Sequence, residues 1–262
     1  MDLLTIFFII CVTLIGEIFG TLFGGGSFFV QPGLLAAGIE PKLSVANDIA
    51  SACFSTYAYL LAKRRVIKDN IGKYSRILLF IFPGIILGAY SGALLLKILP
   101  EYLVIWFVLT IASLGLFKMI FTNLKKRNTG DIIAHGKPVQ YWPLLAVPTS
   151  LLLGFYDGLS GAGGGTLQIL AFALIFRAHM KELILLAALF SGLSLTAASI
   201  SFYYLDLLDF ELLAIMIPVS FLAGIAASKI TDFAKDSHLE NAFIAALSVL
   251  LIYLFTDLLF YA

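Results

Sequence analysis

The sequence predicts an all-α integral membrane protein made of two inverted-topology repeats. Each repeat contains about five helical segments and begins with a glycine-broken re-entrant hairpin. Hydrophobic residues make up 61% of the 262 residues and charged residues only 13%, whereas a soluble domain keeps about a quarter of its residues charged. Three consecutive glycines occur twice inside apolar runs, at 24–26 and 163–165, where they interrupt a helix. The basic residues fall on one side of the membrane in the hairpin topology described below.

Apolar segments recur along the whole chain, and the alternating ten-residue strands of a membrane barrel are not found. The ten segments lie at 3–23, 27–39, 44–62, 77–96, 101–121, 143–161, 166–177, 182–202, 211–229 and 239–261. We expect the first to be a helix of the protein and not a signal peptide, because no basic residue precedes it and no cleavage site follows it. The second and seventh are too short to span, since 13 helical residues rise only about 20 Å against a hydrocarbon core of about 30 Å.

Two topologies are compatible with these lengths: each short segment turns back as a hairpin, or each long and short pair forms one broken span. The hairpin topology places 15 of the 17 lysines and arginines on one face, with only Lys42 and Lys97 on the other, whereas broken spans give 11 and 6. Because cytoplasmic loops carry the excess of basic residues, the hairpin topology is favoured. It places the 63–76 and 122–141 loops in the cytoplasm, and both termini and the 203–211 loop outside.

A hairpin adds no net crossing, so each half crosses three times and the second half starts on the opposite face. The predicted organisation is a first membrane repeat at 1–121, a cytoplasmic linker at 122–141 and a second membrane repeat at 142–262. Inverted repeats with broken helices are a common plan of secondary transporters.

The two glycine breaks are the candidate substrate-binding site. A half-helix starts after each break, and its first N–H groups and positive dipole end suit an anion. Ser27 and Thr166 follow the breaks and are N-cap residue types, whose hydroxyls could satisfy those donors instead. The alternative is that the glycines only permit close helix packing. The residues concerned are Gly24, Gly25, Gly26, Ser27, Gly163, Gly164, Gly165 and Thr166.

Polar side chains on the neighbouring segments extend this candidate site. Gln31 and Gln168 lie on the two half-helices, and Asn47 and Ser51 share one face of the next segment with Ser55. Ser191, together with Ser194, offers a similar face in the second half. Each serine taken alone is better explained by an ordinary helix–helix hydrogen bond, whereas the two stripes after two glycine breaks favour a site.

Three acids inside apolar segments are candidates for ion coupling: Glu17, Asp48 and Asp157. Each could carry a proton, hold a cation, or cap a free backbone group. No basic residue lies mid-span, so a bound anion would rely on helix ends and neutral donors. The three histidines have no ligand spacing and no catalytic motif is found, so we expect no metal, no cofactor and no enzyme activity. A net charge of +1 argues against a nucleic-acid partner.

Several of these residues resemble a known family. The second half contains Gly154-Phe155-Tyr156-Asp157-Gly158 before its glycines, and the first half contains Pro32, Ala36-Ala37-Gly38, Pro41 and Ala46-Asn47 after its own. This pattern resembles the TauE/SafE-type sulfite exporters over essentially the whole chain. Related sequences often carry an aspartate shortly before the first glycines, where this chain has Gly20, with Glu17 one turn earlier.

The resemblance implies a multi-pass permease of the inner (cytoplasmic) membrane that moves sulfite, organosulfonates or related small sulfur-containing anions. The alternatives are a transporter of another small anion or organic acid, or an accessory or enzymatic membrane protein. The expected partners are the small anionic substrate, the lipid bilayer and a coupling proton or cation.

Overall fold

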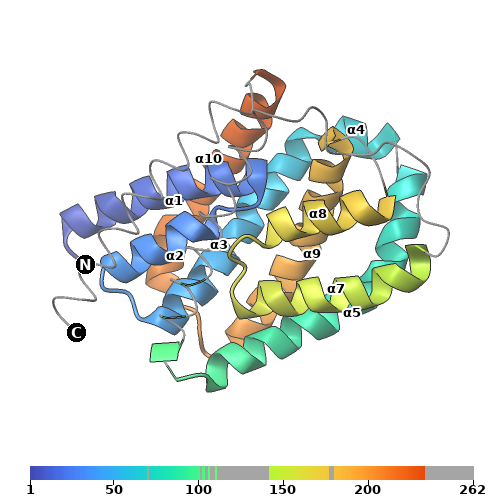
Figure 1. Cartoon of the computed structure of the whole chain (residues 1–262). Helices are drawn as coiled ribbons and strands as arrows, with labels where there is room; N and C mark the ends of the chain where they lie inside the picture. The colour runs from blue at the N-terminus through green and yellow to red at the C-terminus, as the bar shows by residue number, and fades with distance from the viewer. Residues whose placement is uncertain are drawn as a thin grey trace, which may run out of the picture.

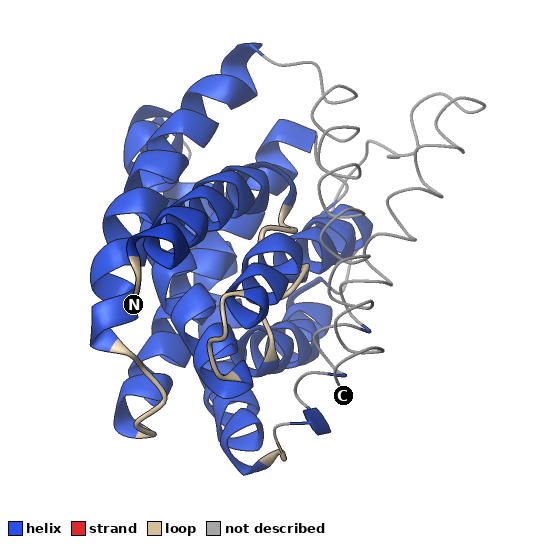
Figure 2. Cartoon of the chain, turned by 90° about the vertical axis from the view of Figure 1, so that its left-hand side faces the viewer, coloured by secondary structure: helices blue, strands red, loops and turns tan. Residues whose placement is uncertain are grey.

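The computed structural model describes residues 1–69, 71–100, 102–103, 106, 110, 142–176 and 180–233, and all regular structure in these ranges is helical (Figures 1 and 2). The predicted all-α class is therefore confirmed for this part of the chain. Within the described ranges, four helices are long and apolar enough to cross a membrane: Leu3–Leu22, Ile77–Ile98, Leu183–Tyr204 and Phe210–Ile230. The helices are α1 (Leu3–Phe23), α2 (Ser27–Ala36), α3 (Pro41–Ala62), α4 (Arg64–Asp69), α5 (Ile71–Ile98), α7 (Trp142–Leu159), α8 (Gly164–Phe176), α9 (Met180–Tyr204) and α10 (Phe210–Phe233).

The helix bounds differ from the predicted segments at three places. Helix α2 ends at Ala36, because Gly38 adopts a left-handed conformation with φ of 80°. Helix α3 begins earlier than predicted, at Pro41, since proline is well suited to the first position of a helix. The predicted 63–76 loop is mostly helical, because α4 and the first turn of α5 occupy it. The linker at 122–141 and the segment at 239–261 lie outside the described residues, as does nearly all of 101–121.

Helices α1 and α2 form an antiparallel hairpin that turns at the first glycine break. Near the turn, Gly26 packs on Gly20, so closely that a methyl group on Gly26 would lie 2.7 Å from the Gly20 Cα. Further along, Gly33 of α2 packs on Val12 of α1. The order of these contacts shows that the chain folds back on itself, as the sequence predicted for this break.

Helices α7 and α8 form a second antiparallel hairpin. Its open end is closed by Trp142 and Phe176, whose ring centroids lie 5.5 Å apart. Near the turn, Gln168 of α8 donates a hydrogen bond to Asp157 of α7 at 2.8 Å. The second predicted turn at a glycine break is therefore also observed.

Helices α3 and α9 pack against each other between the two hairpins (Figure 1). Helix α10, from the second half of the chain, packs on α1 and α3 of the first half. Helix α5, from the first half, packs in the same way on α7 and α9 of the second half. Each half thus contributes one long helix to the other half, and the helix contacts repeat between the halves.

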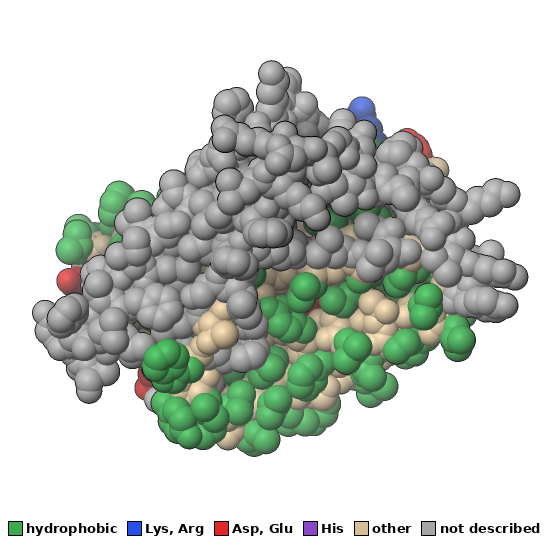
Figure 3. All heavy atoms as spheres, viewed as in Figure 1, with side chains coloured by type: hydrophobic (Ala, Val, Ile, Leu, Met, Phe, Trp, Pro, Cys, Tyr) green, Lys and Arg blue, Asp and Glu red, His purple; other side chains and the backbone are tan. Residues whose placement is uncertain are grey.

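Large hydrophobic side chains are exposed along α5 and α7, where Figure 3 shows them along the lower edge of the molecule. Leu79, Leu87, Leu144 and Leu152 each expose more than 60% of their surface. Soluble monomers rarely expose apolar patches of this extent, and the hydrocarbon of a bilayer would cover this one.

Candidate functional site

The two glycine breaks have the same backbone conformation at equivalent positions. Gly24 and Gly163 both have φ of 74°, a left-handed value that glycine adopts without strain. In the first break Gly24 also ends α1, and its N–H donates to the Gly20 carbonyl at 2.8 Å. The second break contains one further left-handed residue, Gly161, with φ of 65°.

The first half-helix begins at Ser27 as predicted, but the second begins before Thr166, and neither residue occupies the N-cap position that the alternative of capping required. The N-cap of α2 is Gly26, which has no side chain to offer, and Ser27 is already the first residue of the helix. Helix α8 starts at Gly164, so Gly164 and Gly165 belong to the helix and Thr166 is its third residue. Glycine can adopt helical geometry in the first turn, because packing outweighs helix propensity in setting where the helix starts. No capping side chain therefore satisfies the N-terminal donors of α2.

The two breaks meet at the centre of the described structure. A methyl group on Gly165 would lie 2.6 Å from the Gly24 Cα, and one on Gly163 would overlap the ring of Phe28. The Gln31 side-chain amide of α2 also donates a hydrogen bond to the Ser160 carbonyl of the second break. At Gly163 and Gly165 the lack of a side chain is thus required for packing, whatever else these glycines do.

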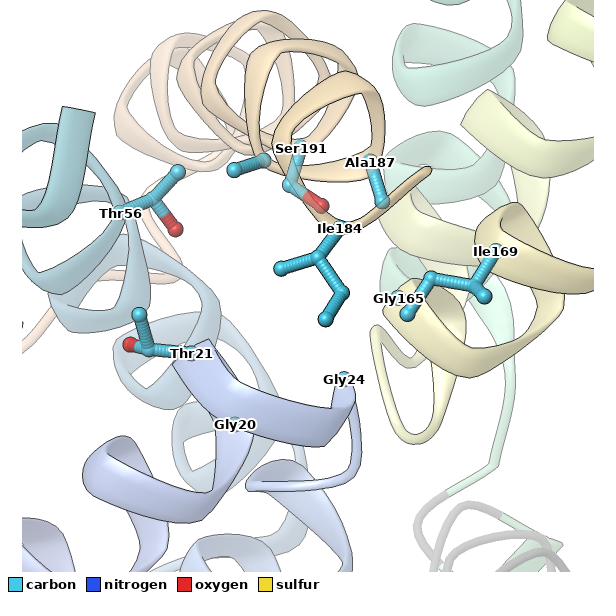
Figure 4. A pocket seen from close by; sticks show the side chains of 10 residues that line it. Gly20, Thr21, Gly24, Thr56, Gly165, Ile169, Ile184, Ala187 and Ser191 are labelled. Carbon is cyan, nitrogen blue, oxygen red and sulfur yellow. The ribbon is translucent and has the colours of Figure 1, made fainter. Parts of the chain in front are cut away.

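A cavity of about 60 Å³ lies where the breaks meet and is lined from both halves of the chain. A smaller space of about 30 Å³ adjoins it, shares Gly20, Gly24, Gly165 and Ser191 with it, and extends to Ile184 (Figure 4). The larger cavity is lined by Glu17, Gly20, Thr21, Gly24, Gly26, Ser27, Ala52, Ser55, Thr56, Asp157, Gly161, Gly165, Ser191 and Leu195.

Glu17 is the acid that the first half contributes to the cavity. Its side chain is 3% exposed, and its two carboxylate oxygens accept hydrogen bonds from α3. Ser55 donates to Oε2 at 2.5 Å and Ser51 donates to Oε1 at 3.4 Å. The serine stripe of α3 therefore holds this acid against the cavity.

Asp157 is the acid that the second half contributes. Gln168 donates to its Oδ2, and Ser191 of α9 donates to the Gln168 carbonyl oxygen at 2.7 Å. Ser194 lies beside the same carboxylate but does not form a hydrogen bond of normal geometry. Since Ser194 is the repeat equivalent of Ser55, each half pairs a buried acid with the same serine position.

Asp48 is the third predicted acid, and it lies behind the cavity between α2 and α3. Gln31 donates to its Oδ2 at 2.9 Å, and the Ser27 hydroxyl lies beside the same carboxylate. Both Gln31 and Asp48 are buried, with exposures of 0% and 1%. The structure thus brings Gln31, Ser27 and Asp48 together, a grouping that the spacing in the sequence did not predict.

The remaining predicted residues lie near the cavity or connect the helices around it. Asn47 connects α3 to the start of α10, because its side chain donates to the Leu43 carbonyl and accepts from the Asp209 N–H. Gly164 packs directly on the Asp157 carboxylate. Gly25 is buried in the first break. None of these three is among the residues that line the two cavities described above.

Two lining residues, Thr21 and Thr56, were not predicted from the sequence. Figure 4 shows both side chains at the edge of the smaller cavity, across from Ser191. The Thr21 hydroxyl is buried and has no hydrogen-bond partner among the described residues. Its position four residues after Glu17 places both on one face of α1, and that spacing was the signal that could have found it.

Comparison with known proteins identifies the family. Residues 8–254 match the family described as sulfite exporter TauE/SafE. The chain belongs to this family. Among curated TauE/SafE-like relatives, a "Probable membrane transporter protein" of Haemophilus influenzae is 28% identical over 179 residues, or 65% of this chain and 62% of the relative.

Two further relatives have similar names and similar coverage. "Probable membrane transporter protein ORF9" of Sinorhizobium is 27% identical over 63% of this chain and 59% of the relative. "Probable membrane transporter protein YfcA" of Escherichia coli K12 is 25% identical over 62% of this chain and 56% of the relative. The chain thus matches less than two thirds of the length of each. No solved structure matches the chain significantly.

Proposed function

We propose that this TauE/SafE-family chain is a membrane transporter for a small sulfur-containing anion such as sulfite or an organosulfonate. The observation that carries the proposal is the cavity between the two glycine breaks, which both halves line with polar groups. Membership of the family supports a small anion as the substrate, and the names of the relatives support transport through a membrane. A different small anion or organic acid is the alternative substrate class.

The cavity can attract an anion without a basic side chain. At the start of α2 the Phe28 and Phe29 N–H groups donate to the Gly25 and Gly26 carbonyls, so an anion would be attracted chiefly by the positive end of the helix dipole. The Thr21 hydroxyl is a further donor, and it has no partner among the described residues. Helices α1, α2, α7 and α8, which form the two hairpins, contain no lysine, arginine or histidine. The proposed recognition therefore depends on helix ends and hydroxyl groups.

Glu17 and Asp157 make coupling to protons part of this proposal. An ionised carboxylate at the cavity would repel the substrate anion, whereas a protonated acid can donate a hydrogen bond to it. One acid lines the cavity from each half, so a proton on either would travel with the anion. Acids at membrane depth are expensive and are typical of such relays.

The proposed membrane arrangement is a multi-pass protein of the cytoplasmic membrane with inverted halves at 1–121 and 142–262. Three features support it: the two hairpins, the repeated helix contacts, and the opposite directions in which α1 and α7 run in Figure 1. Both termini would lie outside the cytoplasm, and the linker at 122–141 inside it.

The test is transport by the purified protein in sealed vesicles. We expect radiolabelled sulfite or a short alkyl sulfonate to accumulate under an inward proton gradient, at least about tenfold above protein-free vesicles, and the accumulation to collapse when a protonophore is added. Acetate and chloride at the same concentration are the comparison substrates. Equal movement of all four anions, or none of any, would contradict the proposal.

A further inference from the structure

Two buried oxygen atoms next to the cavity have no hydrogen-bond donor among the described residues. They are Oδ1 of Asp48 and Oε1 of Gln31. The orientation of the Gln31 amide is fixed, because its nitrogen donates both to Asp48 Oδ2 and to the Ser160 carbonyl. Turning the amide around would place its oxygen against these two acceptors, so the unpaired oxygen cannot be relieved in that way.

None of the helices α1, α2, α3, α7 and α8 offers a free basic side chain to balance Asp48. The surrounding helices α1, α2, α7 and α8 contain no basic residue, and α3 contains only Lys42. Lys42 is engaged elsewhere, since its Nζ donates to the Lys97 carbonyl at 2.8 Å. A buried carboxylate with neither a basic partner nor a full set of donors is costly, and a bound positive charge would remove that cost.

The polar groups around Asp48 supply oxygen ligands. Asp48 offers a carboxylate, Gln31 an amide carbonyl and Ser27 a hydroxyl beside that carboxylate. The Ser160 carbonyl lies on the other side of the Gln31 amide, in the second helix break. Hard cations prefer oxygen ligands, and coupling ions of secondary transporters bind where unwound helices expose their carbonyls.

A monovalent cation fits this set better than a divalent one. One carboxylate balances one positive charge, whereas a divalent ion would leave an uncompensated charge at membrane depth. Among the described residues no group of three or more His, Cys, Asp or Glu lies together as a metal site would require. We infer that Asp48, Gln31 and Ser27 form a sodium-binding site.

The position of this site connects the two halves of the chain. Asp48 and Gln31 belong to the first half, while the Ser160 carbonyl on Gln31 belongs to the second. Ser27 lines the cavity and also lies beside the Asp48 carboxylate. Bound sodium would hold the first half against the second break and place a positive charge near the anion cavity. The inference deepens the proposed anion transport, but sodium binding can be measured without the anion.

The experiment measures the melting temperature of the purified full chain in lipid nanodiscs against sodium concentration. Potassium and choline chloride at equal ionic strength are the controls, and the series is repeated at pH 6, 7 and 8. We expect sodium to raise the melting temperature saturably by about 5 °C, because a ligand that binds only the folded state stabilises it. Choline should give no saturable change.

Three variants locate the site. Asp48→Asn should abolish the sodium response, and Ser27→Ala should shift the sodium titration to about tenfold higher concentration, since one ligand is lost. Asp157→Asn makes the same chemical change in the other half and should keep the response. If Asp48→Asn does not fold, the Ser27→Ala titration still decides.

Three results would overturn the inference. The first is an equal response to sodium, potassium and choline. The second is a sodium response that survives both Asp48→Asn and Ser27→Ala. The third is stability that depends on pH alone and loses that dependence in Asp48→Asn, which would mean that the acid carries a proton. Sodium binding without any anion transport would leave this inference standing and contradict the proposed function.

Discussion

Replacing Gly26 by alanine should open the first hairpin. The new methyl group would lie 2.7 Å from the Cα and 2.9 Å from the N of Gly20, and against the Gly16 carbonyl. Carbon atoms pack at about 3.5–4.0 Å, so α1 and α2 would have to separate by roughly 1 Å. All three neighbours are backbone atoms, and no rotamer change can relieve the contact.

The expected cost follows from this geometry. Gly26 has ordinary helical angles, φ of −61° and ψ of −39°, so alanine adds no backbone strain and the whole effect is steric. Overpacking of this kind costs about 1–3 kcal/mol, which at roughly 2–4 °C per kcal/mol lowers the melting temperature by about 2–12 °C. Because the methyl points at α1, substrate affinity in the surviving protein should change less than stability does.

Gly192→Ala is the matched control. Gly192 also lies inside a helix, but a methyl group there would meet only side-chain atoms, at 3.4–3.7 Å. Alanine favours the helix by up to about 1 kcal/mol, so this variant should melt at or above the wild-type temperature. Melting curves and calorimetric affinities on both variants test the reasoning. If the melting temperature of Gly26→Ala equals that of the wild type, the close contact between α1 and α2 does not limit stability.

Three further predictions concern the cavity and the topology. Gly164→Ala puts a methyl group on the Asp157 carboxylate, so the transport rate in vesicles should fall by more than the loss of folded protein accounts for. An unchanged transport rate would mean that Asp157 does not take part in transport. Glu17→Gln and Asp157→Asn keep the shape of each acid but cannot exchange a proton, so at least one should lose gradient-driven transport by about tenfold or more while inserting normally. If both variants transport at the wild-type rate, neither acid couples. Single cysteines in the 205–209 and 122–141 loops, in a background without Cys11 and Cys53, should react with an impermeant thiol reagent from opposite sides, and labelling from the same side would contradict the hairpin topology.

The helices and the two turns could be predicted because bilayer depth constrains the sequence strongly. Apolar run length defined most segments within a few residues, and the glycine triplets marked both turns. The 63–76 region was predicted as a loop because it is polar and basic. Hydropathy cannot distinguish a polar helix such as α4 from a loop, since both avoid the hydrocarbon.

The candidate site was harder to predict because its contacts are long-range. Glu17 and Ser55 were visible as an acid and a serine stripe, but nothing in the sequence pairs them. Gln31 and Gln168 both bond a buried aspartate, although they are not equivalent positions of the repeat. Residue type alone suggested capping by Ser27 and Thr166 as an alternative, but the N-cap of α2 is Gly26 and α8 already begins at Gly164.

The seam between α5 and α7 bears on which parts of the protein can move. The two helices run parallel, and methyl groups on Gly88 and Gly92 would lie 2.6 Å from the Phe155 N and 2.8 Å from the Leu159 N. The backbones of α5 and α7 are in direct contact here, so few side chains are available to repack if one helix slides past the other. Helix α5 comes from the first half of the sequence and α7 from the second. The rigid bodies of a transport cycle would therefore be assembled across the two repeats, with α5 moving together with the second hairpin.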